Sequence, residues 1–341
     1  MQKVLVTGGL GYIGSHTVVE LENAGYEAVV VDNLSNTELE TTERIHALLA
    51  KETIFYELDI NDTGKLSQVF NEHKISAVIH FAAAKAVGES VTNPLKYYKN
   101  NVAGTVCLLE RMKQYSVNNL IFSSSCTVYG QPDDLPVRED TPVIPAESPY
   151  GNTKQICEEV IRDTVMSDPS FNAISLRYFN PIGAHESGLI GERPQGMPNN
   201  LLPYLLKVAA GELEQLSVFG GDYDTPDGSC IRDYIHVVDL AKAHVIALDR
   251  LINKKNKAGY EIFNLGTGQG SSVLEIIETF EEVTGERVNF QIVDRRPGDV
   301  EKIYSNTDLA NNELGWRAEL DLADMLRSAW KWQQTLNNKT I

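Results

Sequence analysis

Short apolar runs alternate with longer mixed stretches over the first half of the chain. The apolar runs predict buried strands at 3–7, 28–31, 53–58, 77–82, 120–122 and 173–179. The stretches between them predict helices directly after residue 14 and at 62–73, 93–115 and 150–166. Strands that alternate with helices are typical of an α/β fold with a doubly wound parallel sheet, the Rossmann architecture. Right-handed crossovers bring the carboxyl ends of such strands to one edge, where these sheets bind ligands.

The pattern changes after Asn180. Residues 181–230 are rich in Gly, Pro and Asn, which predicts a smaller lobe made largely of loops. Later periodic segments predict a strand near 261–265 and helices near 237–252, 272–284 and 321–336. We expect 231–265 to return to the main sheet. The predicted domains are a Rossmann domain, 1–180 plus 231–265, and a smaller, loop-rich C-terminal lobe that binds substrate, 181–230 plus 266–341.

The first predicted strand runs into a glycine-spaced turn and then a helix. Gly8, Gly11 and Gly14 stand in this turn. The order aims the free amide N–H groups and the positive dipole end of the helix at the sheet edge, where the pyrophosphate of a dinucleotide fits. Asp32, 18 residues after Gly14, ends the next strand. Its carboxylate can accept both adenosine ribose hydroxyls and would repel a 2′-phosphate, so we predict NAD, against the alternative of a purely structural turn.

Composition narrows the classes of partner. The 341 residues carry 47 acidic and 30 basic side chains, a net charge of −17. Nucleic acids and membrane surfaces need a basic face, so we expect neither as a partner. An anionic substrate would need a few arginines placed locally. The four cysteines are widely spaced, the histidines are not clustered as metal ligands, and no apolar run approaches about 18 residues. We therefore expect free thiols, no metal and a cytoplasmic location.

A second group of polar residues follows the later strands. Tyr150 and Lys154 are four apart at the start of a predicted helix, so they share a face, and Ser125 follows a strand that ends at the same edge. A tyrosine that acts as a base near neutral pH needs its pKa lowered by about 3 units. A nearby ammonium and an oxidised nicotinamide are both positive charges that lower it. We predict Tyr150 as acid and base, Lys154 as its activator and Ser125 as a hydrogen-bonding partner of the reacting oxygen. The alternative is a surface tyrosine with a solvated lysine.

With these motifs in place, the chain resembles the extended short-chain dehydrogenase/reductases, and among them the epimerases that act on UDP-hexoses. The resemblance covers essentially the whole chain and rests on segments 8–14, 32–34, 123–130, 150–154, 177–181, 198–201, 232–237 and 295–299. It implies reversible epimerisation at C4, in which UDP-galactose and UDP-glucose interconvert through a transient 4-keto sugar. The hydride would pass to tightly bound NAD and return to the other face of the sugar, with Tyr150 as the acid and base.

The resemblance also implies two sets of binding residues. The positions that match cofactor contacts are Gly8, Gly11, Tyr12, Ile13, Gly14, Asp32, Asn33, Leu34, Ser35, Asn36, Thr37, Asp59, Ile60, Phe81, Ala82, Ala83, Ala84, Lys85, Asn100, Ser125, Tyr150, Lys154 and Phe179. The positions that match substrate contacts are Ser125, Tyr150, Asn180, Asn199, Asn200, Leu201, Ser217, Val218, Phe219, Arg232, Tyr234, Arg296 and Asp299. The two arginines would meet the diphosphate of a UDP-sugar. Ile303, which precedes Tyr304, stands where this family sizes the sugar pocket.

Other functions remain open at this point. A nucleotide-sugar dehydratase on the same fold would carry an Asp-Glu pair after the active serine, where this chain has Cys126 and Thr127. Another UDP-sugar epimerase is a second enzyme alternative. A regulator that senses NAD, or an interaction scaffold, would not need Ser125, Tyr150 and Lys154 together. The resemblance also implies a homodimer formed through helices such as 93–115 and 150–166.

Overall fold

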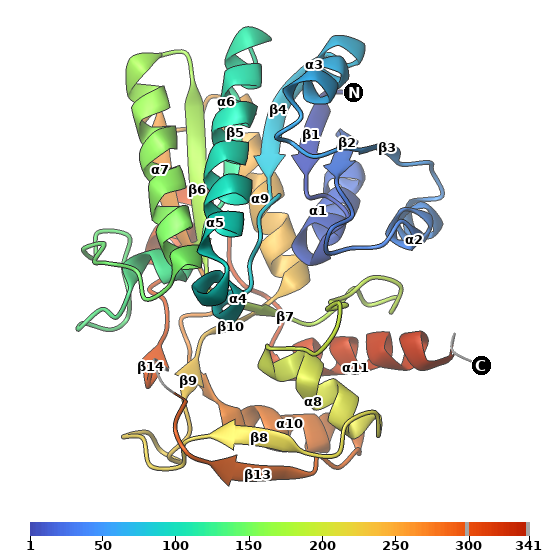
Figure 1. The fold of residues 1–341 in the computed structure, drawn as a ribbon, viewed down its shortest axis with the longest axis vertical. Helices are drawn as coiled ribbons and strands as arrows, with labels where there is room; N and C mark the ends of the chain where they lie inside the picture. Colours follow the sequence, from blue (N-terminus) through green and yellow to red (C-terminus); the bar gives the residue numbers. More distant parts are fainter. Residues whose placement is uncertain (297–299, 339–341) are drawn as a thin grey trace.

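A large parallel sheet organises the N-terminal two thirds of the chain (Figure 1). The structure, a computed structural model, describes residues 1–296 and 300–338. The seven strands lie in the order β11-β6-β5-β4-β1-β2-β3 and all pair in parallel. Their bounds are β1 (Lys3–Thr7), β2 (Glu27–Asp32), β3 (Ile54–Glu57), β4 (Ile75–His80), β5 (Asn119–Ser123), β6 (Asn172–Tyr178) and β11 (Tyr260–Leu265). The predicted fold class, an α/β doubly wound parallel sheet, is confirmed.

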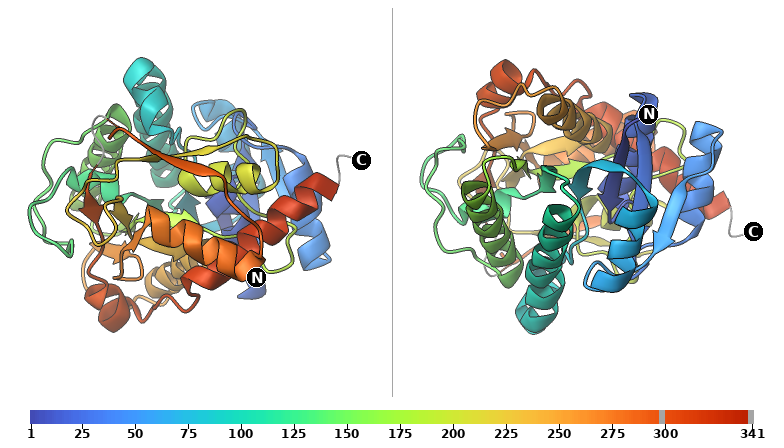
Figure 2. Two further views of the ribbon diagram at one scale, coloured as in Figure 1. Left: turned by 90° about the horizontal axis from the view of Figure 1, so that it is seen from below. Right: turned by 90° about the horizontal axis from the view of Figure 1, so that it is seen from above.

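Helices cover both faces of this sheet (Figure 2). Alternate residues of one strand point to opposite faces, so Val4 and Val6 join one core while Leu5 joins the other. The first core lies under α1 (Tyr12–Asn23), α2 (Glu40–Leu49) and α9 (Val237–Ile252). The second lies under α3 (Thr63–Glu72), α6 (Gly104–Gln114) and α7 (Pro149–Ser167). The two apolar layers fix the sheet, and with it the edge where the strands end.

The segment predicted as one helix over 93–115 is more complex. Pro94 begins α5 (Pro94–Tyr97), a π-helical turn η1 (Tyr98–Ala103) follows, and α6 completes the run. A short helix α4 (Val87–Thr92) precedes it. Gly104 lies so close to the sheet that a Cβ there would come within 2.7 Å of Cδ1 of Ile60. π-Turns often mark functional sites, and this one faces α7.

A small lobe lies beyond the carboxyl ends of the sheet strands (Figure 1). We give this name to α8 (Leu201–Ala209), β8 (Leu216–Phe219), α10 (Val273–Thr284), β13 (Phe290–Val293) and α11 (Leu322–Asn338). All of these elements except β13 contribute side chains to one apolar core. β8 and β13 pair in parallel. Residues 181–230 contain α8 and β8, which the sequence analysis did not predict, but loops make up most of the segment, as predicted. The leucine-rich face of α8 supplies apolar burial that outweighs the Gly- and Pro-rich flanks.

Short strands join the lobe to the sheet. β7 (Asn180–Ile182) pairs with β10 (Tyr234–His236), while β9 (Ile231–Arg232) lies between β12 (Ser271–Ser272) and β14 (Lys302–Ile303). A 3-10 turn, η2 (Cys126–Tyr129), follows β5, and a π-helical turn, η3 (Ala310–Leu314), precedes α11. β11 pairs with β6, so the chain returns to the main sheet after β10. Within 1–296 and 300–338, no helix has the length and apolar character needed to cross a bilayer.

Candidate active site

The glycine turn after β1 is built for close backbone approach. Gly8 has φ +70°, and a Cβ there would lie 2.7 Å from the backbone N of Ala82. A Cβ on Gly14 would lie 2.2 Å from the carbonyl O of Gly8. Gly11 precedes α1 with no side-chain cap, and the first turn of α1 carries no acidic residue. The turn thus presents the start of α1 as a set of backbone donors that suits an anion.

The end of β2 carries the predicted ribose ligand. The buried carboxylate of Asp32 accepts hydrogen bonds from the N of Leu10 at 3.2 Å and the N of Leu34 at 3.0 Å. Burial raises the pKa of Asp32, and the backbone donors oppose that rise. The side chain of Asn33 donates to Asp59 at 3.3 Å, which joins the ends of β2 and β3. Ser35 and Asn36 follow in the same loop and are exposed.

The side-chain hydroxyl of Thr37, in the same loop, is also suited to bind a ligand. Oγ1 of Thr37 is buried, yet it has no hydrogen-bond partner among the residues that the structure describes. A buried hydroxyl without a partner costs about 1–3 kcal/mol, so a ligand that bonds it gains that amount. The uncapped turn, the carboxylate of Asp32 and this hydroxyl together fit a dinucleotide. Ile13 packs against the sheet core beside them, and Ile60 is itself a core residue.

The loop after β4 is held by a residue that the sequence analysis missed. Oδ1 of Asn101 accepts from the N of Ala84 at 2.8 Å, and its Nδ2 donates to the O of Ala84 and to Oγ1 of Thr153, both at 3.0 Å. The side chain of Asn100 donates to Asn101 at 2.9 Å. Asn101 thereby ties the loop that runs from Phe81 through Ala82, Ala83 and Ala84 to Lys85 onto α7. Asn101 is buried in the structure, but the sequence shows only an asparagine inside a predicted helix and gives no signal of this role.

The three predicted catalytic residues come together behind this loop. Ser125 directly precedes η2, and its Oγ accepts from Thr127 N at 3.2 Å and from Thr127 Oγ1 at 3.0 Å. Ser148 caps α7 by accepting from the N of Gly151 at 3.2 Å, which sets Tyr150 in the first turn. Lys154 follows one turn later, and its Nζ donates to the O of Ser123 at 2.7 Å.

Burial dominates the protonation of these groups. It raises the pKa of the Tyr150 phenol well above its ordinary value, and hydrogen bonding with Ser125 opposes part of the rise. Burial lowers the pKa of Lys154 to about 8, while Cys157 and Glu158 act in the opposite direction. The sequence analysis predicted a lowered pKa for Tyr150 beside Lys154 and an oxidised nicotinamide. Burial acts against that lowering, so a base there depends on positive charge close by.

The predicted substrate residues divide into two groups. Arg296 lies over the ring of Phe219, with Cζ 5.4 Å from the centroid, and both side chains are exposed. Arg232 and Asn180 stand on β9 and β7, between the lobe and the sheet. By contrast, the side chains of Val218 and Tyr234 are buried in the core of the small lobe, where they pack against other apolar residues.

The remaining predicted positions are also accounted for. Asn199 and Asn200 are exposed just before α8, Leu201 packs on the lobe core, and Ser217 is half-buried in β8. Phe179 and Ile303 are buried in one small apolar cluster with Cys126. Asp299 lies outside the described residues. The lobe therefore brings the arginines, Phe219 and the asparagines to surfaces that a ligand can reach.

Two contacts tie the segment that follows β7 to the predicted cofactor cradle. The hydroxyl of Tyr12 donates to the O of Gly183 at 2.6 Å. Nζ of Lys85 lies 3.0 Å from Oε1 of Glu192, which also accepts from the side chain of Asn200 at 3.4 Å. Both contacts join the sheet edge to the segment that follows β7. The two ends of the site are thus fixed relative to each other.

Comparison with known proteins decides the family. Residues 5–329 match the family described as GDP-mannose 4,6 dehydratase. The chain is 54% identical over 331 residues to the UDP-glucose 4-epimerase of Haemophilus influenzae, which covers 97% of each protein. The chain belongs to the UDP-glucose 4-epimerase family. This family was the one that the motifs in the sequence resembled.

Solved structures of UDP-glucose 4-epimerases have the same fold. The enzyme of Stenotrophomonas maltophila, with bound NAD and formylated UDP-arabinopyranose, superposes with a TM-score of 0.96 at 47% identity, covering 99% of this chain and 100% of that one. The enzyme of Bifidobacterium longum, in complex with NAD+ and UDP, gives a TM-score of 0.94 at 49% identity, covering 99% of each chain. The epimerase fold thus extends over both the sheet and the small lobe.

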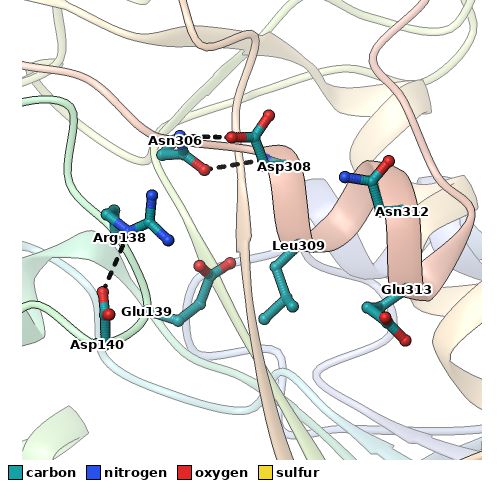
Figure 3. A pocket seen from close by; sticks show the side chains of 8 residues that line it. All are labelled: Arg138, Glu139, Asp140, Asn306, Asp308, Leu309, Asn312 and Glu313. Carbon is teal, nitrogen blue, oxygen red and sulfur yellow. Dashed lines mark hydrogen bonds and ion pairs between the residues drawn. The ribbon is translucent and has the colours of Figure 1, made fainter.

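Figure 3 shows a further cavity, of about 350 Å³, and the residues that line it. Glu139 lines it, and its Oε1 accepts from the N of Asn264 at 2.7 Å. Arg138 on the rim pairs with Asp140 at 3.3 Å. Leu309 is the apolar part of a wall that otherwise consists of Arg138, two asparagines and four acidic side chains. This cavity includes none of the predicted catalytic, cofactor or substrate positions.

Proposed function

We propose that this chain interconverts UDP-galactose and UDP-glucose by inverting C4 of the hexose. The convergence of Ser125, Tyr150 and Lys154 beside an uncapped glycine turn is the observation that carries the proposal. The relatives, which are UDP-glucose 4-epimerases over nearly their whole length, support it independently. We also propose the domain division 1–180 plus 231–265 and 181–230 plus 266–341, because β11 pairs with β6 of the main sheet.

NAD, when bound, supplies the hydride acceptor and donor that inversion of C4 requires. The residues that would hold it are the turn from Gly8 to Gly14, the carboxylate of Asp32 and the hydroxyl of Thr37. We propose NAD and not NADP, because Asp32 already accepts two backbone hydrogen bonds as an anion and would repel a further phosphate.

The chain itself holds and moves a proton at the 4-oxygen of the sugar. Tyr150 takes that proton through its phenol oxygen and later returns it. Ser125, which shares hydrogen bonding with Tyr150, orients the reacting oxygen. Lys154 provides the positive charge that a buried phenol needs in order to ionise, and a cation about 4 Å away at an effective dielectric of 20 is worth about 4 kcal/mol. Burial of all three side chains keeps bulk water from competing for the proton.

The small lobe holds the nucleotide, and the hexose stays free to turn over. Arg232 and Arg296 would supply charge-assisted hydrogen bonds to the diphosphate of UDP, which a chain of net charge −17 otherwise disfavours. Phe219 is 40% exposed and carries Arg296 over its ring, so it offers a flat apolar surface for a base. Grip on the UDP end alone leaves the hexose free to turn, so that either face of C4 could receive the hydride that bound NAD would supply.

The dehydratase alternative lacks its acid–base pair here. Elimination of water needs acidic side chains after the active serine, and this chain has Cys126 and Thr127 there. Burial raises the pKa of the Cys126 thiol to about 12, so it stays protonated at neutral pH. Thr127 donates to Ser125 at 3.0 Å and is occupied in placing it. An NAD-sensing regulator would have no use for the buried Lys154.

Whether the enzyme accepts N-acetylated UDP-sugars depends on the size of Ile303, the residue at the position that sizes the sugar pocket. Ile303 is 7% exposed and packs in the apolar cluster that contains Cys126 and Phe179. Its volume is intermediate between that of a small residue and an aromatic one. Comparison of kcat/KM for UDP-galactose and UDP-N-acetylgalactosamine would measure whether the wall admits the acetamido group.

We further propose that the protein forms a homodimer in the cytoplasm. Val87, Val91 and Leu95 expose apolar side chains on α4 and α5, which pack beside α7. A second copy of this surface would cover them through the helices of 93–115 and 150–166. The four free cysteines suit a reducing compartment. Sedimentation of the purified protein would test the dimer.

The proposed activity has a direct assay. Purified protein is mixed with UDP-galactose, without added NAD, and UDP-glucose is followed by proton NMR. Conversion toward a mixture of both sugars is the expected result, because the cofactor is restored in each cycle and can stay bound. Well-folded, NAD-loaded protein that converts none of the substrate would refute the proposal.

A further inference from the structure

A buried ion pair lies on the same face of α7 as Tyr150 and Lys154. Glu158 is one helical turn beyond Lys154, and its Oε2 lies 2.6 Å from Nη2 of Arg177 on β6. Its Oε1 accepts from Nε of Arg177 at 3.0 Å, so the pair is bidentate. The side chains are 8% and 4% exposed. Burial of two charges is expensive, and a surface helix such as α7 would fold as well with an apolar residue there.

The same carboxylate reaches the strand end that carries the catalytic serine. Oγ of Ser124, which is fully buried, donates to Oε1 of Glu158 at 2.5 Å. The preceding residue, Ser123, accepts from Nζ of Lys154 at 2.7 Å through its carbonyl O. The following residue is Ser125. Ser123 and Ser124 are thus both anchored to α7, and Ser125 hydrogen-bonds with Tyr150 of the same helix. Glu158 supplies the central anchor.

Charge adds to this geometry. Nζ of Lys154 is buried, with the ring of Phe122 4.8 Å away. The titratable and charged groups around it are His80 from β4, Arg177 and Tyr178 from β6, and Tyr150, Cys157 and Glu158 on its own helix. His80 is neutral near pH 7, because burial and Lys154 hold its pKa at about 3. Glu158 is the one carboxylate among these described groups, and it raises the pKa of Lys154.

We propose that Glu158 is a positioning residue for the reaction: it fixes the strand end that presents Ser125 and favours the ammonium form of Lys154. It acts through these two residues and touches no reacting atom. The inference rests on the proposed function, because it needs an activity that requires charged Lys154. Arg177 completes the arrangement by neutralising Glu158 and aligning its carboxylate.

The test compares the pH dependence of kcat in the NAD-loaded protein and its variants. The wild-type rate should fall above pH 8, where Lys154 loses its proton. In Glu158→Gln the fall should begin about one pH unit lower, as expected when one nearby opposite charge is removed. Glu158→Asp keeps the charge and should restore the wild-type position of the fall.

Glu261→Gln is the matched control. Glu261 also forms a buried bidentate pair, with Nε of Arg250 at 2.7 Å and Nη2 at 2.9 Å, but on β11 and α9. The Glu261→Gln protein should lose stability as the Glu158→Gln protein does, and the pH dependence of its kcat should stay that of the wild type. If Glu158→Gln does not fold, Glu158→Gln/Arg177→Gln removes both charges together. The fall should then shift in the same direction but by less, because loss of the Arg177 cation partly offsets loss of the Glu158 carboxylate.

Three results would overturn the inference. One is a Glu158→Gln profile that is lower in rate but not shifted in pH. Another is an equal shift in Glu261→Gln, and the third is an equal shift in Glu158→Asp. Failure of the proposed function itself is distinct, since the wild-type protein would then form no UDP-glucose at any pH.

Discussion

Replacement of Gly14 by alanine tests whether the turn before α1 is a cofactor cradle. In an ordinary helix this change stabilises by about 1 kcal/mol. Here the new Cβ would lie 2.2 Å from the O of Gly8 and 2.8 Å from Cα of Gly9, and Cβ contacts below 3.0 Å are essentially never observed. The turn must therefore retreat by about 0.8 Å, which costs about 1–3 kcal/mol as overpacking. The clashing atoms belong to the backbone of Gly8 and Gly9, which cannot rotate away as a side chain can. The cost of the clash therefore exceeds the stabilisation that alanine gives an ordinary helix.

The expected result is loss of bound cofactor. A cost of about 1–3 kcal/mol corresponds to a roughly 5- to 150-fold weaker affinity for NAD. Gly88→Ala in α4 is the control, since no atom lies within 4 Å of a Cβ built there. NAD content after extensive dialysis and the Kd for added NAD are the measurements. A Gly14→Ala protein that retains NAD as the wild type does would refute the reasoning.

Two further predictions concern cofactor choice and pH. Asp32→Ser should weaken NAD binding about tenfold or more, because charge-assisted hydrogen bonds are lost, and should raise the affinity for NADP relative to NAD. Fluorescence titration measures both affinities. An unchanged ratio of the NADP affinity to the NAD affinity would count against Asp32 as the ribose ligand. Burial holds the pKa of His16 and His80 at about 3 and of His236 and His244 at about 4. The unfolded chain, with ordinary pKa values near 6.5, binds more protons in this range, so stability falls as pH falls from 7 to 5, by up to about 2 kcal/mol per histidine. Urea unfolding at the two pH values checks this, and equal free energies of unfolding would contradict it.

Local sequence signals were sufficient for the parallel sheet and its glycine turn. Each strand is a short apolar run between helices, and the residues that end them, Asp32 and Ser125, are visible without tertiary information. The helix 237–252 was predicted with the bounds that α9 has, because its apolar face is continuous. Right-handed crossovers then bring the carboxyl ends of these strands to one edge, so the edge that carries the site follows as well. The order of the strands was not predicted and comes from the structure.

Tertiary contacts explain what the sequence analysis missed. α8 lies between Gly-, Pro- and Asn-rich segments, and it is stabilised by packing against α11 and β8, which no local pattern reveals. Val218 and Tyr234 match family positions, but their side chains pack in the lobe core. Asn101 and Glu158 act through partners 17 to 52 residues away, such as Ala84, Thr153 and Ser124. Such pairings follow from how strands and helices meet, and one sequence does not specify them.

The most direct test of the mechanism is the turnover of Tyr150→Phe. The change removes one hydroxyl from a buried ring and leaves its packing against neighbouring residues in place. With NAD content matched to the wild type, kcat for UDP-galactose should fall by about 10²–10⁴, the range supplied by a positioned acid and base. Turnover near the wild-type value would show that another group moves the proton and would contradict the account.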